Sequence, residues 1–262
     1  MWKLFKQKPL LTAEDEQFQI ETYRWLLTYF GGKDFYEESK LILPTKAFFP
    51  DKVNAPEEAA QSTFMRVKQY AGLSDWPCQL QAQEEDPNLA LADTLIVRNS
   101  EHSPHGTFVL NDANEGIITY NPKLTSDPVQ MVATFAHELA HYLTSTAPEA
   151  PPGGWENWEF ATDIAATFLG FGIFQANSVF NFRQFTGVGT QGWQTQSGGY
   201  LSESEHSYAL GIFLKLQGMP IEAAYPYCDK NIKALLKRAF KALDEKPHID
   251  QLRQVQLMTK QP

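Results

Sequence analysis

The stretch ATFAHELAHYL, residues 133–143, is the most informative part of this chain because it places the pattern H-E-x-x-H in an apolar setting. Residues four apart lie on one face of an α-helix, so His137 and His141 can offer two imidazole nitrogens to a single ion. Glu138 is rotated away from that axis, yet it can reach a water molecule on the ion and accept its proton. The stretch predicts a metal site with a carboxylate base beside it.

A buried helix is the expected setting for this motif. The residues around the two histidines are largely apolar: Met131, Val132, Phe135, Leu139 and Leu143. Burying two histidines and a glutamate without partners is costly, so these side chains need a metal ion or hydrogen-bonding partners. The competing interpretation is a pair of satisfied core histidines without an ion.

The third ligand of a catalytic zinc site has to come from elsewhere, because zinc in such sites takes three protein ligands and keeps one open position. The metzincin pattern would place glycine and histidine three and six residues after His141, where Thr144 and Ala147 stand. The next predicted helix, residues 155–170, supplies acidic residues instead. The alternatives are Glu156, Glu159 and Asp163.

Glu159 is the expected ligand among these three. It lies 18 positions after His141, enough for a turn and an antiparallel return. Asp163 shares its face one turn later and is expected to accept a hydrogen bond from a ligating imidazole, which fixes the tautomer of that ring.

The order H-E-x-x-H followed on the next helix by E-x-x-x-D resembles the gluzincin, or thermolysin-like, zinc metallopeptidases. EFATDIAA, residues 159–166, is similar to the second-helix motif of small intracellular members. The likeness covers about residues 116–170 and implies one Zn²⁺ per chain, peptide hydrolysis and a strand-rich lobe over the motif helix. The implied roles are His137, His141 and Glu159 as ligands, Glu138 as general base and Asp163 as support for a ligand.

The fold class predicted from the pattern of elements is α+β. Strand-like runs at 93–99, 106–112 and 116–122 precede a helical C-terminal part. With the resemblance, this implies a zincin-like domain with a small, mostly antiparallel sheet over the motif helix. Helices are expected near residues 12–30, 56–72, 127–146, 155–175, 203–217 and 221–244.

Residues 1–55 are expected to form a helical segment packed on a catalytic domain of residues 56–262, the two making one compact unit. GIITYN, residues 116–121, could be a sheet edge that pairs with an extended substrate or an ordinary interior strand. The glycine-rich stretch 186–199 is predicted to be a long loop, either functional or disordered.

Peptide hydrolysis also requires a donor for the developing oxyanion. The candidates are Tyr200, His206 and Tyr208, which follow the glycine-rich stretch. The alternative is an ordinary helix start in which a serine caps the helix and Tyr208 packs in the core. The remaining histidines lie in polar stretches and are expected at the surface: His102, His105 and His248.

Composition limits the partners and the location. The net charge of -9 argues against general nucleic-acid binding, which needs clustered Lys and Arg. The basic run 230–241 is interpreted as a surface helix with a buried apolar stripe. Two cysteines make no disulfide framework, and no signal peptide or stable membrane insertion is predicted, so a cytoplasmic location is expected. A membrane-surface role is the alternative for the first residues, Trp2, Lys3, Leu4, Phe5 and Lys6.

The function predicted from the sequence is that of a zinc-dependent metallopeptidase acting on a peptide or protein substrate, with a metal-activated water and Glu138 as base. One alternative is a non-catalytic zinc-binding module of zincin-like fold that binds or senses a partner. Another is a zinc-free helical scaffold.

Overall fold

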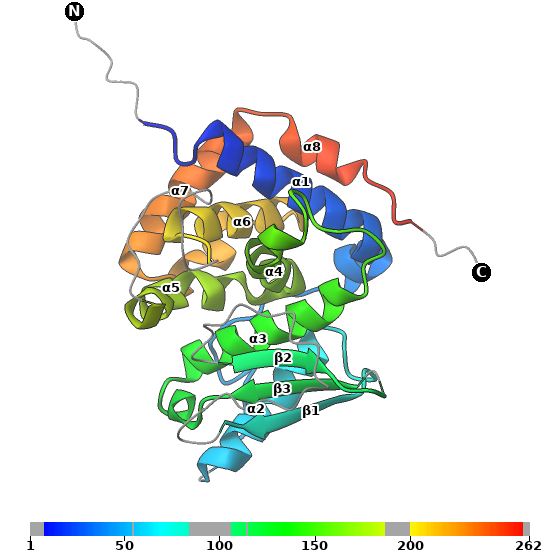
Figure 1. The fold of residues 1–262 in the computed structure, drawn as a ribbon. Helices are drawn as coiled ribbons and strands as arrows, with labels where there is room; N and C mark the ends of the chain where they lie inside the picture. The colour runs from blue at the N-terminus through cyan, green and yellow to red at the C-terminus, as the bar shows by residue number, and fades with distance from the viewer. Residues whose placement is uncertain (1–7, 54, 84–105, 114, 187–199, 259–262) are drawn as a thin grey trace, which may run out of the picture.

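The computed structural model describes residues 8–53, 55–83, 106–113, 115–186 and 200–258 (Figure 1). They form an α+β fold that is mostly helical and has a small three-stranded sheet on one side. The predicted fold class is confirmed at this level. The strand expected at 93–99, His102, His105 and most of the loop 186–199 lie outside the described residues.

The sheet contains β1 (Cys78–Ala82), β2 (Gly106–Leu110) and β3 (Gly116–Tyr120). β3 is the central strand, parallel to β1 and antiparallel to β2. The described sheet is therefore mixed, and the expectation of a mostly antiparallel sheet is wrong for it. GIITYN falls on β3, where both sides are occupied by neighbouring strands, so it is an interior strand and not a free edge.

β2 and β3 form an antiparallel hairpin, and turn residues separate the two strands. Asn111 stabilises that turn, since its side-chain oxygen accepts hydrogen bonds from the backbone N–H groups of Ala113 and Glu115. The hydroxyl groups of Thr107 and Thr119 pair across the strands at 2.8 Å. Phe108 and Ile118 on the opposite face are buried in the core.

The motif helix α3 (Pro128–Ser145) lies between the sheet and the helical layer (Figure 1). Asp127 caps its first turn by accepting a hydrogen bond from the Gln130 N–H at 3.1 Å. Every residue from 130 to 144 is buried, because β2, β3 and the helix α2 (Pro56–Tyr70) pack against α3 and the helices α4 and α5 pack against its other side. The expectation of a buried motif helix is confirmed.

The predicted helix 155–175 is in fact broken. α4 (Trp158–Ala166) continues through a π-helical turn, η4 (Thr167–Phe171), into α5 (Gly172–Thr186). Gly170 at the break has φ 100°, and a Cβ there would collide with the carbonyl oxygen of Lys40. The Gly170 carbonyl accepts a hydrogen bond from the Ile42 N–H at 3.0 Å, so the N-terminal part of the chain docks at this break.

The other helices complete the layer beside α4 and α5. α1 packs against α4, α6 and α8, and α6 packs against α5 and α7. Residues of α1 share one hydrophobic core cluster with the motif helix and α6. The longer helices of this layer are α1 (Ala13–Phe30), α6 (Glu203–Leu216), α7 (Lys230–Asp244) and α8 (His248–Arg253). The short ones are η1 (Asp34–Glu38), η2 (Pro122–Ser126), η3 (Trp155–Asn157), η6 (Ile221–Ala223) and η7 (Tyr225–Tyr227).

The helix starts follow local signals. Thr12 caps α1, Pro56 is the first residue of α2, and Ser202 with Glu205 forms a capping box at α6. The predicted helix 221–244 is two short 3₁₀ turns followed by α7. No helix among the described residues is both long enough and apolar enough to cross a lipid bilayer.

Candidate metal centre

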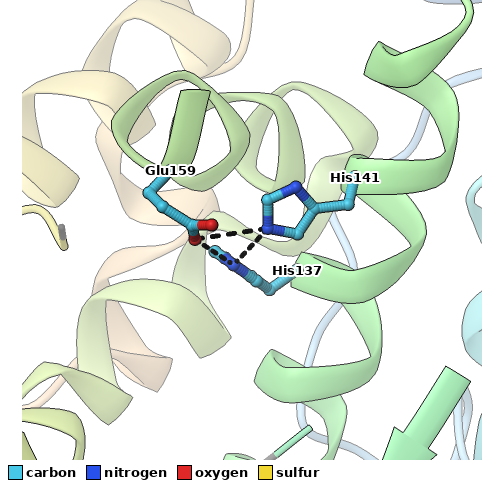
Figure 2. A group of neighbouring side chains, drawn as sticks. All are labelled: His137, His141 and Glu159. Atoms are coloured by element: carbon cyan, nitrogen blue, oxygen red, sulfur yellow. Dashed lines mark hydrogen bonds and ion pairs between the residues drawn. The ribbon is translucent and has the colours of Figure 1, made fainter. Parts of the chain in front are cut away.

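Three side chains from two helices converge between α3 and α4: His137, His141 and Glu159 (Figure 2). The Nε2 atoms of the two histidines are 3.1 Å apart. Glu159 Oε2 lies 3.4 Å from Nε2 of His137 and 3.3 Å from Nε2 of His141. These residues form a cluster that could hold a metal ion.

The spacing of the three ligand atoms fits tetrahedral coordination. With metal–ligand bonds of about 2.0–2.1 Å, a tetrahedral ion holds its ligand atoms about 3.3 Å apart. The three observed separations lie within 0.2 Å of that value. Two imidazole nitrogens and a carboxylate oxygen are also the donor set that zinc and similar divalent transition metals accept.

The convergence requires that the two helices lie side by side, and α3 and α4 pack directly against each other. His137 and His141 share one face of α3, and Glu159 and Asp163 share one face of α4.

His137 is oriented by Asp163, as predicted. Its Nδ1 lies 2.9 Å from Asp163 Oδ1, and the other carboxylate oxygen accepts a hydrogen bond from the Leu201 N–H at 2.9 Å. An Nδ1–H that donates to this carboxylate leaves the Nε2 lone pair free to face the centre of the cluster. Asp163 therefore orients one imidazole of the cluster and is not itself part of the cluster.

His141 is oriented by two residues that the sequence analysis did not identify. Thr162 Oγ1 lies 3.2 Å from its Nδ1, and the ring of Trp158 stands perpendicular to the imidazole at 4.7 Å between centroids. The Trp158 indole N–H donates to Thr144 Oγ1 at 2.8 Å, which fixes the indole. The sequence offered one clue to these two residues, which is that each directly precedes an acidic residue of the predicted site: Trp158 precedes Glu159, and Thr162 precedes Asp163.

The electrostatics of the cluster favour a positive charge at its centre. Burial lowers the pKa of His137, but hydrogen bonds to Asp163 and Glu159 outweigh it and leave the pKa well above 6.5. Burial raises the pKa of Glu159, but the two imidazoles outweigh it and leave that pKa well below its usual value. Both directions have one cause: the carboxylates stabilise the protonated imidazole of His137, and the imidazoles stabilise the ionised form of Glu159.

Glu138 is buried beside the cluster, against the start of the sheet. A Cβ on Gly106 would lie 3.2 Å from Glu138 Oε1, 2.9 Å from the Thr134 methyl group and 2.8 Å from the Thr119 carbonyl oxygen. The absence of a side chain at Gly106 therefore lets β2 begin next to this carboxylate. Burial raises the pKa of Glu138.

The three predicted oxyanion donors lie in different places. The Tyr200 ring is 5.7 Å from the His137 ring, so it lies next to the cluster. His206 Nε2 is 3.5 Å from Asp163 Oδ2, which places it behind the carboxylate that orients His137.

Tyr208 is not brought to the cluster. Its hydroxyl donates to Glu16 Oε1 at 2.9 Å, because residues two apart on a helix point to nearly opposite sides. His248 also differs from expectation, since it is only partly exposed and its Nε2 lies 3.1 Å from the same Glu16 oxygen. Glu156, the other alternative ligand, is exposed and outside the cluster.

Among the described residues, the group of His137, His141 and Glu159 is the one place where three potential metal ligands meet. The side chains of Asp163 and Thr162 hold the two imidazoles in it. Comparisons of the chain with models of protein families, with curated proteins and with solved structures found no match.

Proposed function

We propose that this protein is a zinc-dependent metallopeptidase of zincin-like fold. The observation that carries the proposal is the convergence of three electron-pair donors within 3.1–3.4 Å, with the Glu138 carboxylate on the same helix turn. His137, His141 and Glu159 would hold one zinc ion per chain.

The proposed chemistry divides between the ion and the chain. When bound, zinc lowers the pKa of a water molecule and polarises the carbonyl group to be attacked. Glu138 accepts the proton of the attacking water on a carboxylate oxygen and passes it to the nitrogen of the leaving amine as the C–N bond breaks. Asp163 and Thr162 keep the two imidazoles aligned throughout. Tyr200 is the candidate oxyanion donor, because its ring lies next to that of His137.

The position of β2 supports an extended peptide as substrate. One side of β2 pairs with β3, and no strand of the described residues pairs with its other side. Gly106, at the start of β2, lies against Glu138. A peptide that adds to this edge as a further strand would have its backbone delivered close to the base.

The free thiols of Cys78 and Cys228 agree with the predicted reducing, cytoplasmic location. The cytoplasmic location and the extended peptide substrate are both part of the proposal.

The decisive experiment compares the wild type with Glu138→Gln at equal zinc content on a mixed peptide library, with new termini identified by mass spectrometry. Glutamine keeps the size of the side chain but cannot accept the proton, so cleavage should fall by roughly 10²–10⁴-fold while zinc and fold are retained. Glu156→Gln is the matched control. This glutamate is exposed and lies in η3, directly before α4 and outside the cluster, so the variant should cleave peptides like the wild type.

Two results would contradict the proposal. Equal cleavage by wild type and Glu138→Gln would identify a contaminating protease. A zinc-loaded wild type that cuts no peptide would favour the non-catalytic zinc-binding module.

A further inference from the structure

The carboxylate of Asp163, on α4, connects side chains of two other helices. Its Oδ1 lies 2.9 Å from Nδ1 of His137 on α3. Its Oδ2 accepts a hydrogen bond from the Leu201 N–H at 2.9 Å and lies 3.5 Å from Nε2 of His206 on α6. Each oxygen of this carboxylate therefore faces an imidazole, and only the imidazole of His137 belongs to the metal cluster.

The surroundings of Asp163 make the contact with His206 significant. Asp163 is 2% exposed and His206 is 3% exposed, so water does not replace a missing donor easily. Among the described residues, the ion-pair partners of Asp163 are the two imidazoles, and no Lys or Arg lies within 4.0 Å of it. His206 is therefore the side chain outside the metal cluster that turns a nitrogen toward this carboxylate.

The imidazole of His206 acts as the donor in this contact. A carboxylate offers only acceptor oxygens, so a ring nitrogen that faces it carries the proton. The distance of 3.5 Å is longer than that of an ordinary N–H···O hydrogen bond, so the attraction is chiefly electrostatic. The stronger contact of Leu201 fixes the position of Oδ2, and His206 limits the rotation of the carboxylate around it.

Local signals at the start of α6 bring both groups to the same oxygen. Ser202 and Glu205 form a capping box, and the His206 N–H bonds to the Ser202 carbonyl oxygen at 2.9 Å in the first turn. Leu201 directly precedes the cap. The backbone donor and the imidazole are thus held by one rigid helix start, and α6 in turn packs against α4, α5 and η4.

We propose that His206 is a positioning residue for His137 and acts through Asp163. It holds the carboxylate in place, and the carboxylate holds the Nδ1–H of His137, so that Nε2 of His137 faces the centre of the cluster. This role differs from that of an oxyanion donor, because the Nε2 of His206 faces a carboxylate of the protein. The inference rests on the metal centre of the proposed function, but not on peptide hydrolysis.

The first test is a competition titration of zinc against a chelator. His206→Leu fills a similar volume without a donor and should weaken zinc binding by about three- to tenfold, less than a change at Asp163 itself. His206→Gln keeps a nitrogen donor near the place of Nε2 and should bind zinc nearly as tightly as the wild type. Ser207→Ala is the control, because this neighbouring residue is equally buried and its hydroxyl has no hydrogen-bond partner.

A double-mutant cycle tests the route of the effect. If His206 acts through Asp163, adding His206→Leu to Asp163→Asn should cost little further zinc affinity. Losses that simply multiply would mean that His206 acts on the site independently of Asp163.

A measurement on the metal-free protein separates this inference from the proposed function. The Nδ1–H proton of His137 should give a ring N–H resonance by NMR in the wild type and in His206→Gln. Exchange with water should broaden that resonance in His206→Leu, because the carboxylate is held less firmly. A wild type that binds no zinc would contradict the proposed metallopeptidase, and this resonance would still decide the role of His206.

The proposal is overturned if His206→Leu and Ser207→Ala bind zinc equally well, if the two losses in the double variant multiply, or if the His137 resonance does not respond to His206→Leu. Circular dichroism establishes that each variant is folded. If His206→Leu does not fold, His206→Asn replaces it, since its amide nitrogen lies near the place of Nδ1 and not of Nε2.

Discussion

Two clusters of this molecule combine glutamate with histidine, and they differ in kind. Between α3 and α4, Glu159 faces the Nε2 atoms of His137 and His141. Between α1, α6 and α8, Glu16 accepts hydrogen bonds from Lys246, His248 and Tyr208. In both places, several side chains lie within hydrogen-bonding distance of one carboxylate.

The difference lies in what balances the charge. Glu16 faces the permanent cation of Lys246 and a phenol donor, so this cluster is neutralised by the chain itself. Around Glu159, the facing atoms can all donate a lone pair, and no Lys or Arg of the described residues pairs with it. The balancing charge is therefore either a proton on an imidazole, as the raised pKa of His137 allows, or the metal ion that we propose. The donor set, more than the presence of His and Glu, distinguishes a metal centre from an ion-pair network.

The largest expected difference between the clusters is in metal content. His141→Ala should lose the zinc ion and all peptidase activity, whereas His248→Ala should keep one zinc per chain. The zinc-free form should also unfold at a lower temperature, because metal binding stabilises the folded state. Elemental analysis and thermal melts of both variants measure this. Equal zinc content in His141→Ala and His248→Ala would contradict the proposed difference between the two clusters.

Ligand and support within the metal cluster should be separable. Glu159→Gln removes a charged ligand and should leave the site largely empty. Asp163→Asn keeps the shape but weakens the hold on His137, and should lower zinc affinity by about 10–100-fold. Competition titration with a chelator gives both affinities. If Asp163→Asn empties the site and Glu159→Gln leaves it filled, the two roles are reversed.

A smaller effect is expected at Thr162. Thr162→Val removes the hydroxyl group beside Nδ1 of His141 and should weaken zinc binding by about tenfold, at the low end of the range for residues that orient ligands. Thr167→Val is the control, because this buried hydroxyl contacts a backbone carbonyl and not an imidazole. The same chelator titration applies, and equal affinities for both variants would exclude a role for Thr162.

The smallest expected effect concerns the other cluster. Glu16→Gln keeps an acceptor for Tyr208 but loses the charge facing Lys246, whose side chain is 44% exposed. Stability should fall by about 1–2 kcal/mol, because partly exposed ion pairs contribute little and the hydrogen bonds are only weakened. Urea unfolding measures the change. Zinc content should not change, and a loss of zinc here would mean that the clusters are coupled.

The sequence predicted the parts of the site that depend on local spacing. His137 and His141 share a helix face by periodicity, and Glu159 and Asp163 share another, so their convergence required only that two adjacent helices pack. The starts at Thr12, Pro56 and Ser202 were predictable for the same reason, since capping is decided within one helix turn.

Features that depend on distant residues were not predictable. β1 has one strongly apolar residue, Leu80, and is a strand because β3 lies beside it. The break at Gly170 depends on the approach of Lys40 and Ile42 from another part of the chain. Tyr208 was a candidate because a phenol can donate a hydrogen bond to an oxyanion. It lies on the side of α6 that faces Glu16, which depends on how α6 packs against α1.

The packing of α1 has a consequence for synthesis on the ribosome. This helix is made early, but Tyr23 donates its hydroxyl to the Ala209 carbonyl, 186 positions later, and Glu16 meets Lys246, 230 positions later. At roughly 5–20 residues per second, these partners appear on the order of ten to forty seconds after α1. During that interval the part of α1 that contacts α6 and α8 has no native surface to cover it. The packing of α1 is therefore complete only after the last helices of the chain have been made.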